Sequence, residues 1–565
     1  MMRQRILLLL AALLLLPQAF FAQGIKPAKN VIFMIADGTS LSSISLARWY
    51  QNLEAGKLTK LHLDPYMSGT VITFCSNAPI GDSAPTTSTY MNGMPSIQGM
   101  VGTYPYATES DIVPVDKEMA YRPLVSLMEA TQLLHQRKIG LVMTSEFPHA
   151  TPADAISHSY SRKRYDWIIP QMVHNSIDVV IGGGAGLISE EQVKFLEKKG
   201  YGVFRNNLAS LTEHKGDKLW SLFSKRDIPY DIDAVEGVDP KIDEMVSAAL
   251  THLDHNNPNG FFLLVEGSKV DWAAHANDPV AMATDILAFD RAVKVALDFA
   301  KADGNTIVVL TSDHGNSGVS IGRRDLKNYA GTPKEQIFGP LTKIAKSSVG
   351  LAEMITKAEE SKIGTLFEEI STFAPSEQEL EVLKLLRKLE LASDAERPAI
   401  KKQLKELNMT GEGALYTGGL SDYIAAIYRT KMYIGFTTNG HTGEETFLAT
   451  YAPTEEQRLK GVHTNIELHD YLRQALGIEP TMMDLSHQYF APHSEVFKGT
   501  KVSITGEDAK DKVLTVKYKR KTLKIQSFTN QLLINGKLQE LPMPVVYVDK
   551  RGEFYLPTSL RDLLM

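Results

Sequence analysis

Cysteine is nearly absent from this sequence: Cys75 is the only one among 565 residues. A single cysteine excludes an intrachain disulfide bond, which many exported proteins use to stabilise their fold. Metal ions bound in the core could supply part of that stability, because a ligand that binds only the folded state favours folding. We interpret Cys75 as a small core residue, since buried thiols pack as hydrophobes.

An excess of positive charge is also missing. The formal net charge is −6, and it becomes −8 without Arg3 and Arg5 of the N-terminal segment. This sign argues against nucleic acid as the main partner, because the phosphate backbone attracts basic proteins. With 43% hydrophobic and 22% charged residues, the composition also excludes a disordered or fibrous chain.

Long apolar runs are missing everywhere except at the N-terminus. There, Arg3 and Arg5 precede an apolar run over residues 6–17, and the stretch ends Ala19-Phe20-Phe21-Ala22, with small residues at 19 and 22. This arrangement is typical of a signal peptide, so we expect residues 1–22 to be removed and the protein to be periplasmic or secreted. The alternative is an N-terminal membrane anchor, for which the run is short. No later segment reaches membrane length, and the mature protein is expected to be soluble.

From residue 28 onward, short apolar runs alternate with helical stretches. The clearest strands are residues 30–36, 139–144, 179–181, 261–265 and 306–311. Strands that are apolar on both faces and separated by helices predict an α/β fold, with a mostly parallel central sheet sandwiched by helices. We assign residues 23–496 to this domain.

Two regions depart from that pattern. Residues 320–430 are predicted to form a helical insertion over the edge of the sheet that carries the site, with an amphipathic helix over 376–391 and a second from Pro398 to Leu407. Residues 497–565 alternate apolar and polar positions, and Asn535-Gly536 predicts a tight hairpin turn. This small β-rich module carries a basic patch that we interpret as a solvated face, with a partner contact as the alternative: Lys517, Lys519, Arg520, Lys521 and Lys524.

Residues 265–275 concentrate the most chemistry. Glu266 ends a predicted strand, and Asp271 and His275 follow, four residues apart. A helix that begins near Asp271 places these two side chains on one face, one turn apart. A carboxylate and an imidazole so placed can share one divalent metal ion, and Glu266 is free to serve a second one nearby.

Other potential ligands also follow predicted strands or lie in loops. Asp37 and the pair Asp313-His314 come directly after strands, and His441 lies in a later loop. Asp271, His275 and His441 could give one zinc ion two imidazoles and a carboxylate, and Asp37, Asp313 and His314 could hold a second metal. The oxygens of Thr151 and Glu266 suit a harder ion such as magnesium.

Taken singly, each of these residues has a simpler explanation. An aspartate after a strand is usually a helix cap, and Ser83 at a helix start is most simply an N-cap. An Asp-His pair usually lies on the surface, and Arg162 is by default solvated. The combination is what favours a metal-dependent site.

As a joint pattern, these segments resemble the alkaline phosphatase family, over roughly residues 28–480. The matching motifs occur in the family's order: Ile35-Ala36-Asp37-Gly38, Asp82-Ser83-Ala84, His149-Ala150-Thr151-Pro152-Ala153 with Ser161-Arg162, Val265-Glu266-Gly267 with Asp271 and His275, Asp313-His314, and His441-Thr442-Gly443. The resemblance is poor across 320–430 and absent beyond about 497.

Carried over by position, the resemblance implies hydrolysis of small phosphate monoesters through a covalent phosphoserine on Ser83, with Arg162 holding two phosphate oxygens. It implies one zinc site at Asp271, His275 and His441, a second at Asp37, Asp313 and His314, and a magnesium site at Asp37, Thr151 and Glu266. No organic cofactor is required, because phosphoryl transfer mainly needs positioning and charge neutralisation. The resemblance also allows a homodimer, which the insertion could block or replace.

His149 and Trp272 depart from one well-known bacterial pattern, which has aspartate and lysine at these positions, although other members of the family carry histidine and tryptophan. We expect both to lie at the substrate site. His149 could ligate a metal, but we favour a hydrogen bond to a metal-bound water. Trp272 could also simply pack beside the site.

Two other functions remain open. A related hydrolase of phosphodiesters or sulfate esters would use Thr86 or Thr87 as the nucleophile. Asp82-Ser83-Ala84 and Arg162 argue for monoesters, because a diester needs room for a second substituent where Arg162 would lie. A non-catalytic protein that keeps its metals for stability is the third alternative.

Overall fold

Ten strands form the central sheet of the computed structural model, which describes residues 25–407 and 418–564. Their spatial order is β14 (Gly461–Thr464), β2 (Met67–Ile72), β13 (Thr446–Tyr451), β8 (Thr306–Thr311), β1 (Asn30–Ala36), β7 (Phe261–Gly267), β3 (Lys138–Glu146), β4 (Val179–Gly183), β6 (Leu219–Phe223) and β5 (Gly202–Arg205). Only β13 runs antiparallel to its neighbours β2 and β8. The predicted mostly parallel sheet is confirmed, and the predicted signal peptide lies outside the described residues.

Both faces of the sheet are covered, as the apolar strands predict. Val31, Phe33 and Ile35 of β1 join a core cluster with the helices α3 (Ser83–Asn92), α4 (Leu127–His135) and α18 (Asn465–Ala475). The intervening Ile32 and Met34 face α9 (Ile242–Asp254) and α11 (Pro279–Asp303) on the other side. This alternation follows from the two-residue period of a strand. Cys75 is buried, as expected.

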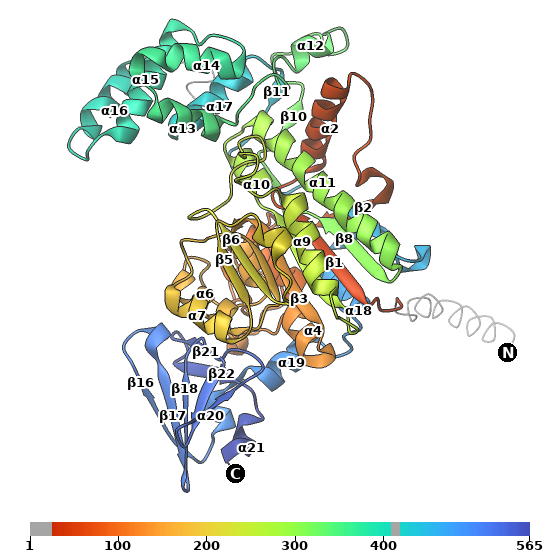
Figure 1. The fold of residues 1–565 in the computed structure, drawn as a ribbon, viewed down its shortest axis with the longest axis vertical. Coiled ribbons are helices and arrows are strands. Elements are labelled where there is room, and N and C mark those ends of the chain that lie inside the picture. Colours follow the sequence, from red (N-terminus) through yellow and green to blue (C-terminus); the bar gives the residue numbers. More distant parts are fainter. Residues whose placement is uncertain (1–24, 408–417, 565) are drawn as a thin grey trace, which may run out of the picture.

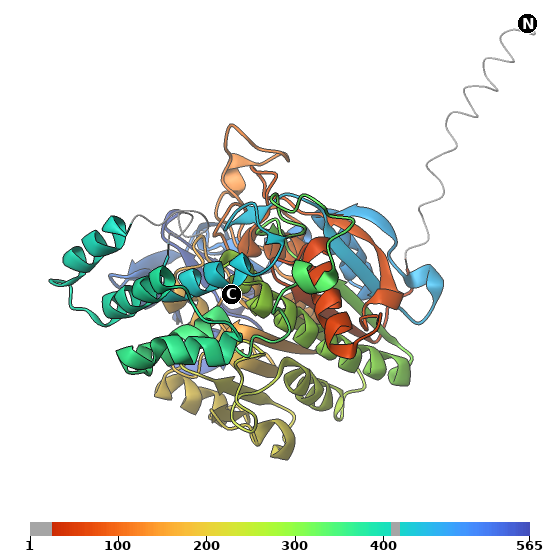
Figure 2. The same ribbon diagram turned by 90° about the horizontal axis from the view of Figure 1, so that it is seen from above.

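The insertion is helical, as predicted, and forms a layer of its own beyond the sheet (Figures 1 and 2). Its helices are α12 (Lys334–Ile337), α13 (Ser348–Lys357), α14 (Ile363–Ser371), α15 (Glu377–Leu391), α16 (Arg397–Glu406) and α17 (Leu420–Thr430). In α15 the capping box of Ser376 and Glu379 is present, and Leu383 and Leu386 are buried. These helices share a core with α2 (Leu41–Ala55) and the start of α11, through Leu46, Tyr50 and Val280.

The C-terminal segment is β-rich, as predicted, and lies at the opposite end of the molecule from the insertion (Figure 1). Its five-stranded antiparallel sheet consists of β16 (Lys501–Thr505), β17 (Val513–Tyr518), β18 (Lys521–Gln526), β19 (Gln531–Ile534) and β20 (Lys537–Glu540). A three-stranded sheet joins β21 (Val546–Val548) and β22 (Glu553–Leu556) to β15 (Ala491–Pro492), which precedes residue 497. Asn535 and Gly536 form the predicted turn, both with positive φ (51° and 81°).

This C-terminal module packs on α6 (Tyr165–His174) of the main body. The rings of Trp167 and Phe528 stack at a centroid distance of 5.5 Å, and His174 Nδ1 lies 2.9 Å from Asn530 Oδ1. Because Trp167 and Phe528 belong to one continuous core cluster, the module is part of the fold that supports the site.

Candidate active site

Asp37, Glu266 and the Asp313-His314 pair lie at the carboxyl ends of three neighbouring strands. β8, β1 and β7 are adjacent and parallel, and Ile35 of β1 lies between Thr311 and Glu266 in the register. Their carboxyl ends therefore meet, which places Asp37, Glu266 and the Asp313-His314 pair together, as the sequence predicts. In open parallel sheets this edge is where sites are built.

The helix α10 (Lys269–His275) follows β7 and carries Asp271 and His275 on one face. His275 Nε2 lies 3.4 Å from Asp271 Oδ2. The turn before α2 must come very close to this helix, because a Cβ on Gly38 would lie 2.5 Å from Asp271 Oδ1. Gly38 also has φ +62°, so both space and backbone conformation require glycine.

His441 reaches the site through a short pair of strands. β12 (His441–Thr442) pairs antiparallel with β9 (Gly315–Asn316), which comes directly after His314. The imidazoles of His314 and His441 stack at a centroid distance of 3.7 Å. A residue 166 positions downstream of His275 is thereby brought within 3.3 Å of it, measured between the Nε2 atoms.

All three imidazoles have Nδ1 next to a backbone carbonyl oxygen, which can only accept a hydrogen bond. The acceptors are Asn439 for His275 (2.6 Å), Gly81 for His441 (3.0 Å) and Gly315 for His314 (3.1 Å). In a neutral ring, Nδ1 therefore carries the hydrogen and the Nε2 lone pair faces the cluster. This second hydrogen bond is the usual way in which a metal-binding histidine is oriented.

The ligand atoms form two compact groups that share the edge of the sheet. Asp37, Asp313 and His314 have their ligand atoms within 4.8 Å of one another, and so do Asp271, His275 and His441. In the first group, His314 Nε2 lies 3.4 Å from both Asp37 Oδ1 and Asp313 Oδ2. Each group offers the mixture of imidazole nitrogen and carboxylate oxygen that zinc accepts.

Several oxygens of these groups are buried without a hydrogen-bond partner among the described residues. They are both carboxylate oxygens of Asp37, Asp313 Oδ2, Thr151 Oγ1 and Glu266 Oε1. An unpartnered buried carboxylate is costly unless a cation neutralises it. Each residue of the third predicted group, Asp37, Thr151 and Glu266, thus has at least one buried oxygen atom without a partner, and this chemistry fits a magnesium-type ion.

The same crowding is visible in the pKa values of two of the carboxyl groups, those of Asp37 and Glu266. Burial, reinforced by the charges of Asp271 and Asp313, raises the pKa of Asp37 well above its usual range. Burial also raises the pKa of Glu266 to about 7. A site in which carboxylates disfavour one another's ionisation is one that favours bound cations.

Ser83 lies beside this cluster, in the first turn of α3. Its Oγ is 3.5 Å from His314 Nε2, and the side chain is buried. Asp82, not Ser83, occupies the N-cap position, so the simpler explanation of Ser83 as a cap is wrong. The hydroxyl is free of any capping hydrogen bond and lies where the helix N-terminus adds positive potential.

Arg162, His149 and Trp272 form the neighbouring wall. Arg162 Nη2 lies 3.0 Å from His149 Nε2, and Nη1 lies 3.3 Å from Asp82 Oδ1. The His149 ring contacts the Trp272 ring edge to face, with centroids 5.6 Å apart. Burial and the charge of Arg162 lower the pKa of His149 to about 3, so the imidazole is neutral and its Nε2 can accept from the guanidinium.

Three residues that the sequence did not single out as site residues also contribute. Asp82 lies within 4.8 Å of His314 and His441, measured between ligand atoms, besides accepting from Arg162. Asn316 Nδ2 donates to Asp271 Oδ1 at 2.7 Å, and Asn439 supplies the carbonyl that orients His275. The available signals were the place of Asp82 in the Asp82-Ser83-Ala84 motif and the proximity in sequence of Asn316 and Asn439 to His314 and His441.

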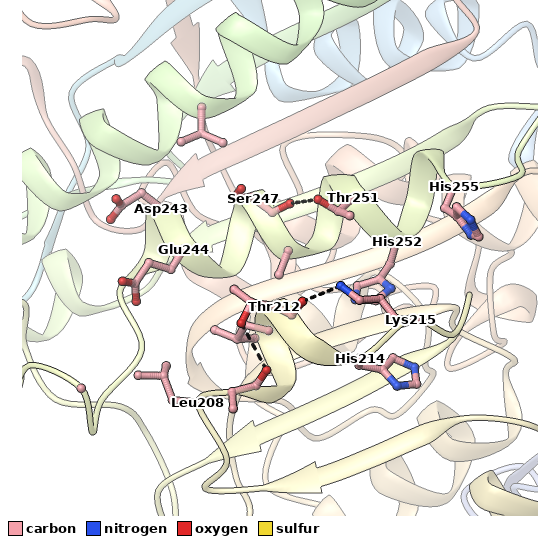
Figure 3. Close-up of a pocket in the computed structure, with 15 residues that line it drawn as sticks. Leu208, Thr212, His214, Lys215, Asp243, Glu244, Ser247, Thr251, His252 and His255 are labelled. Atoms are coloured by element: carbon pink, nitrogen blue, oxygen red, sulfur yellow. Dashed lines mark hydrogen bonds between the residues drawn. The ribbon is translucent and has the colours of Figure 1, made fainter.

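A cavity of about 950 Å³ lies elsewhere, between α8 (Ser210–Glu213) and α9 (Figure 3). His214, His252 and Glu244 are among its lining residues, and none of the residues of the metal groups lines it. His252 and His214 place their rings 5.4 Å apart, but His252 Nδ1 is already next to the carbonyl of Gly216. The cavity is therefore separate from the candidate active site.

The sequence also matches known proteins. A family model for alkaline phosphatase matches residues 28–478. Alkaline phosphatase 3 of Bacillus subtilis is 29% identical over 440 residues, which is 76% of this chain and 85% of that protein.

Solved structures share the fold. The cold-active alkaline phosphatase of a psychrophilic Shewanella is 25% identical, with a TM-score of 0.65 over 79% of this chain and 99% of that one. A mutant alkaline phosphatase of the Antarctic bacterium TAB5, with Mg bound in its M3 site, shares the fold at 20% identity, with a TM-score of 0.53 over 81% of this chain and 100% of that one.

Proposed function

Because the chain belongs to the alkaline phosphatase family, it is a phosphate monoester hydrolase, and we propose that it acts through a covalent phosphoserine on Ser83. The observation that carries this proposal is the position of Ser83 Oγ, 3.5 Å from His314 Nε2 at the edge of the metal-binding groups. The rival hydroxyls of Thr86 and Thr87 are buried in α3 and have no hydrogen-bond partner among the described residues, so neither is bonded to a ligand of the metal groups as Ser83 is.

The residues present fit three cations. Asp271, His275 and His441 would hold one zinc ion, Asp37, Asp313 and His314 the other, and Asp37, Thr151 and Glu266 a magnesium ion. When bound, the metals supply positive charge that lowers the pKa of a nearby hydroxyl or water and neutralises charge on the transferring phosphoryl group.

Ser83 supplies the nucleophile. A bond forms between its Oγ and phosphorus while the bond from phosphorus to the alcohol oxygen breaks, and the alcohol leaves with a proton. Water then attacks the phosphoserine, which releases inorganic phosphate and restores the Ser83 hydroxyl. The N-terminus of α3 faces the developing negative charge, which its dipole stabilises.

Arg162 would hold two non-bridging phosphate oxygens with its planar guanidinium. Asp82 and His149 contact one end nitrogen each, Nη1 and Nη2, and so fix the orientation of the fork before substrate arrives. His149 therefore acts here as a positioning residue for Arg162, with its ring held against Trp272. His149 Nδ1 has no hydrogen-bond partner among the described residues, so the expected hydrogen bond between this imidazole and a metal-bound water stays a prediction.

We also propose that the protein is exported. The charged and apolar N-terminal segment would direct the chain to the periplasm or the medium. None of the helices in the described part of the chain is long and apolar enough to cross a membrane.

The test compares 4-nitrophenyl phosphate, bis(4-nitrophenyl) phosphate and 4-nitrophenyl sulfate on protein whose zinc and magnesium contents are measured. The proposal predicts that kcat/KM is highest for the monoester, because Arg162 occupies the space that a second ester substituent needs. A higher kcat/KM for the diester or the sulfate ester would contradict it in favour of a related hydrolase. No activity on any of the three would favour a non-catalytic metal protein.

A further inference from the structure

The C-terminal module has the opposite charge from the rest of the chain. Residues 497–565 contain ten lysines and three arginines against seven acidic residues, a formal charge of +6. The whole chain carries −6, so the remaining residues carry −12. The basic patch in the sequence is thus part of a separation of charge between two parts of one molecule.

Six of these cations gather at one end of the five-stranded sheet, which we call the cationic end: Lys501, Lys517, Lys519, Arg520, Lys521 and Lys537. Lys501 lies directly opposite Lys517 in the register. The turn between β17 and β18 consists of Lys519 and Arg520. The turn between β19 and β20 is at the same end, since Asn535 Oδ1 accepts from Thr522 N at 2.8 Å.

These charges are not neutralised by the part of the chain that the structure describes. Among the described residues, no carboxylate lies within ion-pair distance of the six cations, and Lys521 Nζ instead contacts the carbonyl of Leu563 at 3.1 Å. Glu540, the acidic residue of the same sheet, is paired with Lys199 of the main body. Like charges directly opposite on neighbouring strands destabilise a sheet, so Lys501 and Lys517 are unfavourable for folding alone.

The Lys519-Arg520 turn is a second, independent indication. Lys519 has φ +52°, at a position where two-residue hairpin turns favour glycine or asparagine. The neighbouring turn has the favoured pair, Asn535-Gly536. A lysine with a positive φ is strained, and strained backbone conformations are concentrated at functional sites.

Exposed aliphatic side chains accompany the cations. Leu533 and Leu538 lie opposite each other on the outer face of the sheet, 39% and 57% exposed, and Leu563 is 40% exposed next to Lys521. Cations that flank exposed leucines match the interface of an anionic bilayer, where headgroups attract the charges and the apolar side chains enter the acyl boundary. An acidic polysaccharide offers no such apolar phase.

We propose that the cationic end is a docking site for an anionic phospholipid surface. Figure 1 places the module at one end of the molecule, so a membrane can contact it without covering the insertion at the other end. The protein would bind peripherally, because attraction of this kind is reversible and falls with salt. This inference concerns a different surface from the active site and does not depend on the proposed hydrolysis.

The experiment is co-sedimentation of the purified protein with vesicles of phosphatidylcholine containing 30% phosphatidylglycerol. We expect binding at low salt, much weaker binding at 0.5 M NaCl and none to vesicles of pure phosphatidylcholine. The variant Lys519→Asn/Arg520→Gly copies the neighbouring turn and removes two charges. Its affinity for the anionic vesicles should fall about 25-fold, at about fivefold per charge, while its Tm is kept or raised.

The matched control is Lys401→Gln/Lys405→Gln, which removes two exposed charges from α16 at the other end of the molecule and should bind like the wild type. Equal loss in both variants would overturn the assignment of the site, because only net charge would then matter. Absence of vesicle binding, or binding to a sulfated polysaccharide such as heparin but not to the vesicles, would overturn the lipid partner.

Discussion

Glu266 shows why this site needs cations. Its pKa is raised by burial from 4.5 to about 7, so without metal the folded state binds a proton more tightly than the unfolded chain does. The metal-free protein should therefore lose stability as pH rises from about 4.5 to 7. The contribution of Glu266 to that loss is at most about 3 kcal/mol of unfolding free energy.

Urea unfolding of the chelated protein at pH 4.5 and pH 7 measures this loss. The wild type should lose more stability between the two values than Glu266→Gln, in which the side chain cannot ionise. Returning zinc and magnesium should abolish the loss in the wild type. Identical pH dependence in the chelated wild type and the variant would refute the claim that burial disfavours the ionisation of Glu266.

His149 provides a second prediction for a single residue. His149→Ala removes the acceptor of Arg162 Nη2 and should lower kcat/KM for a monoester about tenfold or more, in line with a lost hydrogen bond to a charged group. The inhibition constant of inorganic phosphate should rise in parallel. His149→Gln, whose amide oxygen can accept from Arg162, should recover much of both. Equal defects in the two variants would argue against the positioning role.

At the scale of elements, the stacked rings of Phe528 and Trp167 are one of the contacts that hold the C-terminal module to the main body. Phe528 is 1% exposed and stacks on Trp167 of α6, which follows Arg162 closely in sequence. Phe528→Ala should lower the unfolding free energy by about 3–5 kcal/mol, because it leaves a cavity in a shared core. The exposed Leu538→Ala should change it by only about 0.5 kcal/mol. Comparable urea midpoints for the two variants would contradict this packing.

The elements that the sequence predicts best are those buried on both faces. Residues 30–36 and 306–311 are strands with the predicted bounds, because uninterrupted apolar runs leave few alternatives. β9 and β12, by contrast, have two residues each, and no periodicity can be read from so short a segment. Their pairing positions His441, so residue types could suggest this histidine as a ligand, but the sequence could not show which segment brings it to the site.

Part of the site could also be predicted from the sequence. Asp37, Glu266 and Asp313 could be grouped in advance because parallel strands bring their carboxyl ends to one edge. The contact between His149 and Arg162 could not, since it depends on side-chain orientations in two loops. Asp82 was similarly hidden, because its role beside Arg162 and His441 depends on the fold of distant segments.

At the scale of the whole molecule, the proposed catalysis and the proposed membrane docking belong to different parts of the chain. The ten-stranded sheet builds the metal-binding edge, and the family model ends at residue 478, before the C-terminal module begins. The insertion and the module lie at opposite ends of the molecule (Figure 1). The catalytic proposal therefore depends on the shared part of the chain, and the docking proposal on the part that is not shared.

The central claim is that Ser83 becomes phosphorylated during turnover. The most direct measurement is acid quenching of the metal-loaded protein during turnover of a ³²P-labelled monoester, followed by peptide mapping. The account predicts label on the peptide that contains Ser83, and none in Ser83→Ala, whose kcat should fall by about 10³-fold or more. Label on Thr86 or Thr87, or a Ser83→Ala variant with nearly full activity, would contradict it.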